Sequence, residues 1–117
     1  MEIKHTPGPW NYIGNGDVVA RSDKYCGGEK DIASVFLTVN DEDEANARLI
    51  AQAPTLLTEL KNARAFIQEH HDSFVESCTN LATGLIDDYD DILTAEASQD
   101  LLNGIDDAIA KATGGQA

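Results

Sequence analysis

The chain has 117 residues, of which 42% are hydrophobic, and 21 acidic side chains against eight Lys and Arg give it a net charge of −13. This length predicts a single domain over residues 1–117 with a core of its own, and the apolar content excludes a disordered tail. The excess of acid disfavours direct binding to nucleic acid or to an anionic membrane, because both depend on clustered Lys and Arg.

Residues 1–39 favour a three-stranded antiparallel meander. Two prolines in the opening segment exclude a helix there. The predicted strands are residues 10–13, 18–20 and 32–39, on the basis of β-branched and aromatic content. Asn15-Gly16 is typical of a type I′ hairpin turn, since both residues tolerate positive φ. Residues 21–30 are predicted to form a polar loop before the third strand.

Residues 40–113 favour helices, so the predicted fold class is α+β. Asn40 is a typical N-cap, and the four acids after it suit the positive end of a helix dipole. Pro54 predicts a break near residues 52–53 and the start of a second helix. Apolar spacing then predicts helices over 54–71, 72–92 and 101–112, with a break over 93–97 and an end at Gly114-Gly115.

The long helices leave more apolar surface than a small sheet covers. The doubled stripe over residues 74–92 and the stripe over 101–112 are the largest of these surfaces. Burial against another copy of the chain is the natural solution, so the sequence predicts a homo-oligomer.

The motifs of the common enzyme classes are absent from the sequence, which predicts a protein that is not an enzyme. There is no Gly-x-Ser-x-Gly elbow, no P-loop and no HExxH. His70 and His71 are adjacent, and neighbouring helical residues point about 100° apart, so a shared metal ion is disfavoured. The acidic run 87–91 lacks the glycine and the alternating acids of a calcium loop. No metal or cofactor is predicted.

Residues 21–30 are the first candidate for a ligand site. This segment carries Arg21, Lys24 and Lys30 beside Tyr25, whose ring could stack on a base, and a Gly-Gly pair allows close approach of backbone. These side chains could hold a nucleotide-like anion, or the segment could be a surface loop without a ligand. Trp10 is predicted to belong to the core rather than to a ligand platform.

Arg48 and Asn46, early in the first helix, are the second candidate. They could flank a pocket beside the sheet, because Arg binds phosphate through two parallel hydrogen bonds. The alternative is a surface Arg48 that pairs with Glu44, four residues earlier on the helix.

Cys26 and Cys78 are isolated from each other in the sequence. Two isolated cysteines are no disulfide framework, so both are predicted to be reduced thiols in a cytoplasmic protein. No apolar run approaches the ~18 residues that a membrane span needs.

Four stretches together resemble a broad group of small bacteriophage proteins. They are His5-Thr6-Pro7-Gly8-Pro9-Trp10, Val18-Val19-Ala20, Ala45-Asn46-Ala47-Arg48-Leu49-Ile50-Ala51-Gln52-Ala53-Pro54 and the tail 108–115. The resemblance covers nearly the whole chain in the same order. The small sheet followed by long helices is also similar to the Thoeris anti-defence proteins, which phages use as sponges. That similarity implies a non-enzymatic homo-oligomer, from a dimer up to a hexamer, that sequesters cyclic ADP-ribose-type signals or cyclic oligonucleotides.

The leading prediction is a phage counter-defence protein in the cytoplasm of the infected bacterium. It would bind a cyclic nucleotide immune signal without cleaving it. The predicted ligand residues are Arg21, Lys24, Tyr25, Lys30, Asn46 and Arg48. The alternative is an acidic interaction protein whose carboxylates mimic DNA phosphates and block a host nucleic-acid-binding defence protein.

Overall fold

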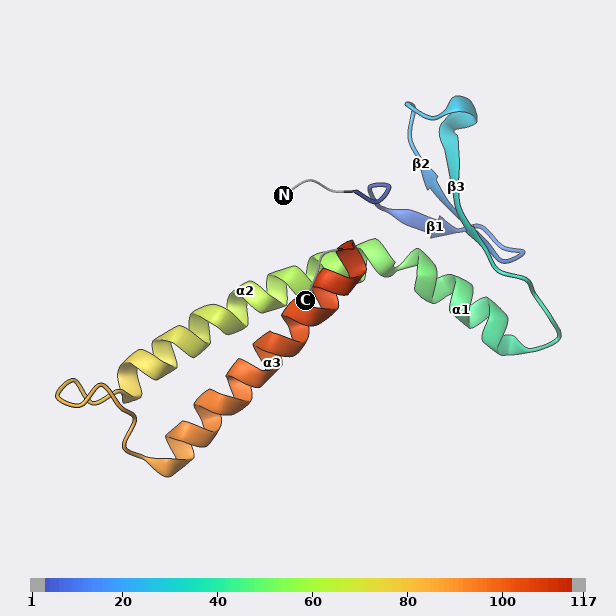
Figure 1. Ribbon diagram of the computed structural model, residues 1–117. Helices are drawn as coiled ribbons and strands as arrows, with labels where there is room; N and C mark the ends of the chain where they lie inside the picture. The colour runs from blue at the N-terminus through green and yellow to red at the C-terminus, as the bar shows by residue number, and fades with distance from the viewer. Residues whose placement is uncertain (1–3, 115–117) are drawn as a thin grey trace. The chain divides into compact units, whose positions relative to one another are not determined.

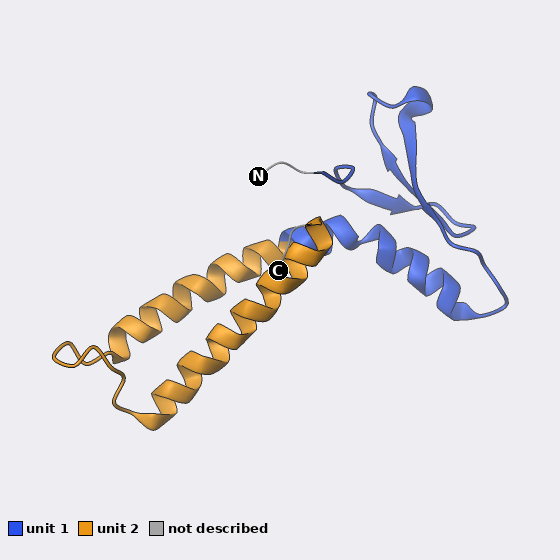
Figure 2. Cartoon of the chain, viewed as in Figure 1, with its two compact units in different colours: residues 1–58 blue, residues 59–117 orange. Residues whose placement is uncertain are grey.

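A computed structural model describes residues 4–114, and the chain divides into two compact units, residues 1–58 and 59–117 (Figures 1 and 2). The strands are β1 (Trp10–Tyr12), β2 (Asp17–Arg21) and β3 (Glu29–Ser34), with a short 3-10 helix, η1 (Cys26–Gly28), before β3. The helices are α1 (Asp41–Ala51), α2 (Ala53–Cys78) and α3 (Tyr89–Thr113). The predicted α+β class, with a meander first and long helices after it, is confirmed.

The sheet in unit 1 has the order β1-β2-β3, and both strand pairs are antiparallel. The β1–β2 turn forms as its Asn-Gly pair predicts: Asn15 and Gly16 have φ of 53° and 80°, and Asp17 N–H donates to Gly14 O at 3.0 Å. Gly16 is also buried, and a Cβ atom there would lie 2.0 Å from Val35 O. Glycine is therefore required at this position both by backbone conformation and by space.

The third strand lies earlier in the chain than predicted, because a strand extends only as far as its partner does. Ser34 pairs with Asp17, the first residue of β2, so residues 35–39 have no strand beside them. Their polar groups bond elsewhere: Val35 N–H donates to Gly16 O at 2.8 Å. At the other end, Arg21 pairs with Glu29, so the predicted loop 21–30 shortens to residues 22–28.

One face of the sheet packs against α1. Val18, Ala47 and Ala51 form the buried centre of this core. Trp10 packs against the same cluster while its Nε1–H donates to Thr6 O at 3.0 Å, which confirms its predicted place in the core. Ala47 and Ala51 lie four residues apart on one helix face, so the small side chains of the Ala45–Pro54 stretch have a packing role.

The break before Pro54 lies where the sequence predicts it. α1 ends at Ala51, Gln52 caps it, and α2 begins at Ala53 with Pro54 in its first turn. Gly8 lies against Pro54, since a Cβ atom on Gly8 would be 2.9 Å from the proline Cβ. The opening segment and the start of α2 thus pack together within unit 1. The predicted N-cap is confirmed as well, because the Asn40 side chain accepts from Glu42 N–H at 3.0 Å.

The helix boundaries after residue 71 differ from the prediction. α2 continues without a break to Cys78, and the predicted helix over 72–92 is interrupted by a loop over 79–88. Asn80 is the second residue of this loop, and its side chain accepts from Ala82 N–H at 2.8 Å. Asp88 then caps α3, because its side chain accepts from the backbone N–H groups of Asp90 and Asp91 in the first turn. The predicted break over 93–97 is wrong, since these residues lie inside α3.

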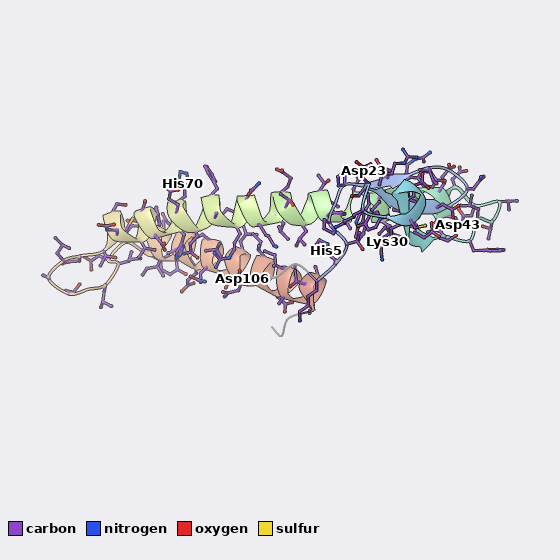
Figure 3. All side chains as sticks on the ribbon, turned by 90° about the horizontal axis from the view of Figure 1, so that it is seen from above. His5, Asp23, Lys30, Asp43, His70 and Asp106 are labelled. Atoms are coloured by element: carbon purple, nitrogen blue, oxygen red, sulfur yellow. The ribbon has the colours of Figure 1, made fainter. Side chains whose placement is uncertain are left out.

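In unit 2 the helices α2 and α3 run side by side in opposite directions (Figures 1 and 3). The side chains between them recur at alternating steps of three and four residues, as in a coiled coil. We call these positions the seam. They are Leu60, Arg64, Ile67, His71, Phe74 and Cys78 on α2, and Asp91, Ala95, Ser98, Leu102, Ile105 and Ile109 on α3. Only Leu102 and Ile105 are buried outright, and the other seam residues remain partly exposed.

Two polar contacts join the helices of unit 2. Arg64 donates to both carboxylate oxygens of Asp106, and His71 Nδ1 is hydrogen bonded to Ser98 Oγ. Both cysteines are free thiols, as predicted. Within residues 4–114 no helix is both long enough and apolar enough to cross a membrane.

Candidate ligand-binding site

The segment between β2 and β3 is ordered by its own backbone hydrogen bonds. Ser22 N–H donates to Gly28 O at 3.1 Å, Tyr25 N–H to Ser22 O at 3.1 Å, and Gly28 N–H to Tyr25 O at 2.8 Å. The second and third of these bonds fold residues 22–28 into two successive tight turns. Tyr25 lies where the two turns meet, so its position is set by the loop backbone.

Two lysines flank the Tyr25 ring. Lys24 Nζ lies 5.4 Å and Lys30 Nζ 5.9 Å from the ring centroid, within the range of cation–π attraction. Tyr25 is half-buried, whereas both lysines are exposed. We call these three residues the Tyr25 cluster. An aromatic face with two adjacent ammonium groups can receive a base by stacking and a phosphate by charge-assisted hydrogen bonds.

Arg21 is close to this cluster in sequence but already has a partner. Its Nε lies 3.2 Å from Glu29 Oε1, across the β2–β3 ladder. Both side chains are exposed, so the ion pair is weak and the guanidinium keeps donors available to a ligand.

Arg48 lies in a different group, with Tyr12 and Glu44. Its guanidinium is 3.4 Å from the Glu44 carboxylate, which is the ion pair considered as the alternative for this residue, and its Cζ lies 5.6 Å from the Tyr12 ring centroid. Tyr12 Oη donates to Glu44 at 3.0 Å and accepts from Gly16 N–H at 3.2 Å. Asn46 is exposed on α1. Sequence reasoning placed Tyr12 in a strand but missed its contact with Arg48, because that contact depends on how α1 packs on the sheet.

The predicted ligand residues therefore form two groups. Tyr12, beneath Arg48, pairs with Val18 on β2, whereas the Tyr25 cluster follows Arg21 at the far end of the same strand. Three residues along a strand span about 10 Å. The structure brings Lys24, Tyr25 and Lys30 together and leaves Arg48 and Asn46 with the other end of the sheet.

Two concave surfaces of unit 1 are lined by acidic side chains. One is lined by Asp17, Asp31 and the end of β3 around Ser34, and another by residues 37–41 with Glu44. Neither contains one of the predicted basic ligand residues. A phosphate would be repelled from these two hollows, whereas the cationic Tyr25 cluster would attract it.

The carboxylate of Asp43 organises the approach to α1. Thr38 donates to it from its hydroxyl and, at 2.7 Å, from its backbone N–H, and these bonds lower the pKa of Asp43 below its usual 3.8. A carboxylate with these partners stays charged at neutral pH and holds residues 38–43 against the start of α1.

The two adjacent histidines have separate environments. His71 lies on the seam of unit 2 with Ser98, whereas His70 points outward from α2 and its ring lies 4.2 Å from that of Phe66 (Figure 3). The sequence predicted that both histidines lie near the end of their helix. In the structure they lie well inside α2, which continues to Cys78. Among residues 4–114 no three His, Cys, Asp or Glu side chains gather in a way that could hold a metal ion.

A family model described as Salmonella phage P22 protein Y8K6 matches residues 1–116. The chain belongs to this phage protein family. Comparison with curated proteins gave no match, and comparison with solved structures gave none either. Membership of the Y8K6 family supports the predicted bacteriophage origin and covers both compact units of the chain.

Proposed function

We propose that this Y8K6-family protein is a phage counter-defence protein that captures a cyclic nucleotide signal of its host without cleaving it. The supporting observation is the Tyr25 cluster, in which the ammonium groups of two exposed lysines lie over the ring of one tyrosine. The ligand class is cyclic ADP-ribose or a cyclic oligonucleotide, both of which combine bases with phosphates. The protein would act as a homo-oligomer in the cytoplasm of the infected bacterium.

The chemistry of the cluster suits such a ligand. Stacking of a base on an aromatic side chain contributes about 1–3 kcal/mol, and each hydrogen bond to a charged phosphate about 1.5–3 kcal/mol. The phage origin of the family supplies the biological setting. The ligand class is the one that the resemblance of the sequence to the Thoeris sponges implies.

Calorimetric titration of cyclic ADP-ribose isomers and cyclic dinucleotides tests this proposal. We expect binding to the wild type, and a loss of about tenfold or more in affinity for Tyr25→Ala and for the double change Lys24→Ala/Lys30→Ala. Tyr25→Phe should bind almost normally if the ring acts by stacking. Lys61→Ala, which removes a lysine from α2, is the control for net charge.

Recovery of the ligand separates capture from catalysis. Heating the complex should release the intact nucleotide, and a cleaved product would contradict the proposal. If the wild type binds none of these nucleotides, the proposal of nucleotide capture is wrong.

Arg48→Ala examines the second group of predicted ligand residues. If Arg48 and Asn46 also contact the ligand, this substitution weakens capture about tenfold or more. If Arg48 serves only its ion pair with Glu44, the affinity stays within about twofold, because exposed pairs on a helix contribute about 0.3–0.5 kcal/mol.

The acidic interaction protein is the second candidate, and the carboxylate-lined hollows of unit 1 favour it. Such a protein would bind a basic, nucleic-acid-binding host protein and lose that complex as salt is raised. Its binding should be unaffected by Tyr25→Ala, which distinguishes it from nucleotide capture.

A further inference from the structure

The loop over residues 79–88 joins α2 to α3 at one end of unit 2 (Figure 2). Its backbone is held by hydrogen bonds: Asn80 N–H donates to Leu85 O at 2.8 Å, and Gly84 N–H donates to Asn80 O at 2.7 Å. Gly84 supplies the positive φ, 73°, that the turn requires. These contacts define a six-residue tip, residues 80–85, whose backbone already has a fixed conformation in the chain alone.

The tip presents two leucines to solvent. Leu81 is 98% exposed and Leu85 66%. The remaining residues of the tip are small or uncharged polar ones: Asn80, Ala82, Thr83 and Gly84. Burial of a leucine side chain contributes about 1.5–3 kcal/mol, and a loop that is ordered beforehand loses little conformational entropy on binding. The tip is therefore suited to insert into an apolar pocket of a partner.

The end of unit 2 that carries the tip is acidic without exception. Residues 65–105 contain no Lys or Arg, and their nine acidic residues are Glu69, Asp72, Glu76, Asp87, Asp88, Asp90, Asp91, Glu96 and Asp100. The basic residues of unit 2 are Lys61, Arg64 and Lys111, toward the other end of the helix pair. Arg64 lies 14 residues before the end of α2, which is about 21 Å along the helix and beyond the screening length of about 8–10 Å at physiological salt.

This charge decides which kind of partner can cover the tip. A nucleic acid, an anionic membrane and the same tip of a second copy are all negatively charged, so each of them would be repelled. A protein pocket edged by Lys and Arg would be attracted, because the acids that flank the leucines complement it.

We infer that the tip over residues 80–85 docks on a basic protein, with Leu81 and Leu85 in an apolar pocket and the acids of the flanking helices against its Lys- and Arg-rich edge. The leucines supply most of the affinity, while the acids speed association and select a basic partner. The second candidate function also has a basic partner, but this inference rests on a different surface. It is independent of nucleotide capture, since the Tyr25 cluster lies in unit 1.

Affinity purification with the immobilised full chain provides the partner for a quantitative test. The probe is the heparin-binding fraction of a Salmonella extract, because heparin retains proteins with basic surfaces and the family is described by a Salmonella phage protein. A protein that the wild type retains is then purified and titrated by calorimetry. Its Kd should rise as NaCl is raised from 50 to 500 mM. Leu81→Ala and Leu85→Ala should each raise Kd about tenfold or more.

Two variants serve as controls. Leu101→Ala removes the same atoms from another exposed leucine, which lies on α3 about 18 Å from the start of that helix, so its Kd should stay within about twofold of the wild type. Tyr25→Ala should also bind the protein normally, which separates this interaction from nucleotide capture. Circular dichroism verifies folding, and Leu81→Ala should retain it because that side chain is almost fully exposed.

The inference is overturned if the wild type retains no protein from this fraction, or if neither leucine substitution changes Kd. Wild-type binding to phosphatidylcholine vesicles that Leu81→Ala abolishes would also overturn it, since lipid would then cover the tip. A self-associated mass that the same substitution lowers to 12.6 kDa would show that a second copy covers it instead.

Discussion

Single residues in unit 1 illustrate how a sequence motif can serve packing rather than chemistry. In the Ala45–Pro54 stretch, Ala47 and Ala51 are buried against Val18, and Pro54 contacts Gly8. Larger side chains at these positions would separate α1 from the sheet. The basic residue of the stretch, Arg48, lies on the exposed side with Glu44.

Gly16 is the position in unit 1 where the structure permits the least change. Gly16→Ala should destabilise unit 1 by about 3 kcal/mol or more, because the added Cβ meets Val35 O at 2.0 Å and φ is +80°. Gly14→Ala is the matched control: its φ is +92° but nothing lies within 4 Å of the added atom, so it should cost about 1–2 kcal/mol.

Denaturation followed by the fluorescence of Trp10, the single tryptophan of the chain, reports on unit 1 directly. If Gly16→Ala and Gly14→Ala lower the free energy of unfolding equally, Val35 moves away from the added Cβ atom without a measurable loss of stability.

At the scale of elements, unit 2 depends on a narrow seam. Only Leu102 and Ile105 are buried along it, and the Arg64–Asp106 pair adds a polar link between α2 and α3. The hydrogen bond from Arg64, and to a lesser extent its positive charge, lowers the pKa of Asp106 below its usual 3.8. A carboxylate with a lowered pKa in the folded state stabilises that state above the unfolded pKa and loses this effect in acid.

We therefore expect part of the acid sensitivity of unit 2 to come from Asp106. Its stabilising effect is complete well above pH 3.8 and disappears as the pH falls through the lower pKa of the folded state. Asp106→Asn should lower the urea midpoint of helix unfolding at pH 7. It should also reduce the difference between the urea midpoints measured at pH 7 and at pH 3. Asp100→Asn removes the same charge elsewhere on α3, so its urea midpoints at pH 7 and pH 3 should differ by as much as those of the wild type. If the two variants respond alike to pH, the link to Arg64 has no measurable effect on stability.

At the scale of the whole molecule, charge governs what the chain can associate with. A net charge of −13 opposes self-association, while the Tyr25 cluster attracts anions locally. The two proposed interactions should therefore respond to salt in opposite directions.

Raising NaCl from 50 to 500 mM should strengthen the proposed homo-oligomer, because screening reduces the repulsion between acidic chains. The same change should weaken nucleotide capture, since the lysines act through charge. Sedimentation equilibrium and calorimetry at the two salt concentrations measure these effects. An assembly that salt dissociates would point to ion pairs between the copies rather than to apolar contacts.

Local signals in the sequence were sufficient for much of the fold. The Asn15-Gly16 turn, the Asn40 cap and the break at Pro54 each depend on the conformational preferences of a few adjacent residues, and all three are confirmed. The α+β class follows from the same local patterns. The clustering of Lys24 and Lys30 around Tyr25 could be suspected because all three lie within a few residues of one another.

Only the tertiary structure decided the remaining features, because they depend on partners distant in sequence. β3 ends at Ser34 since β2 begins at Asp17, although the strand pattern continues to residue 39. Apolar spacing continues through the loop over 79–88, so periodicity alone could not reveal that α2 and α3 are separate helices. Arg48 and the Tyr25 cluster are kept apart by the length of β2, a distance set by the pairing of strands rather than by any residue in either group.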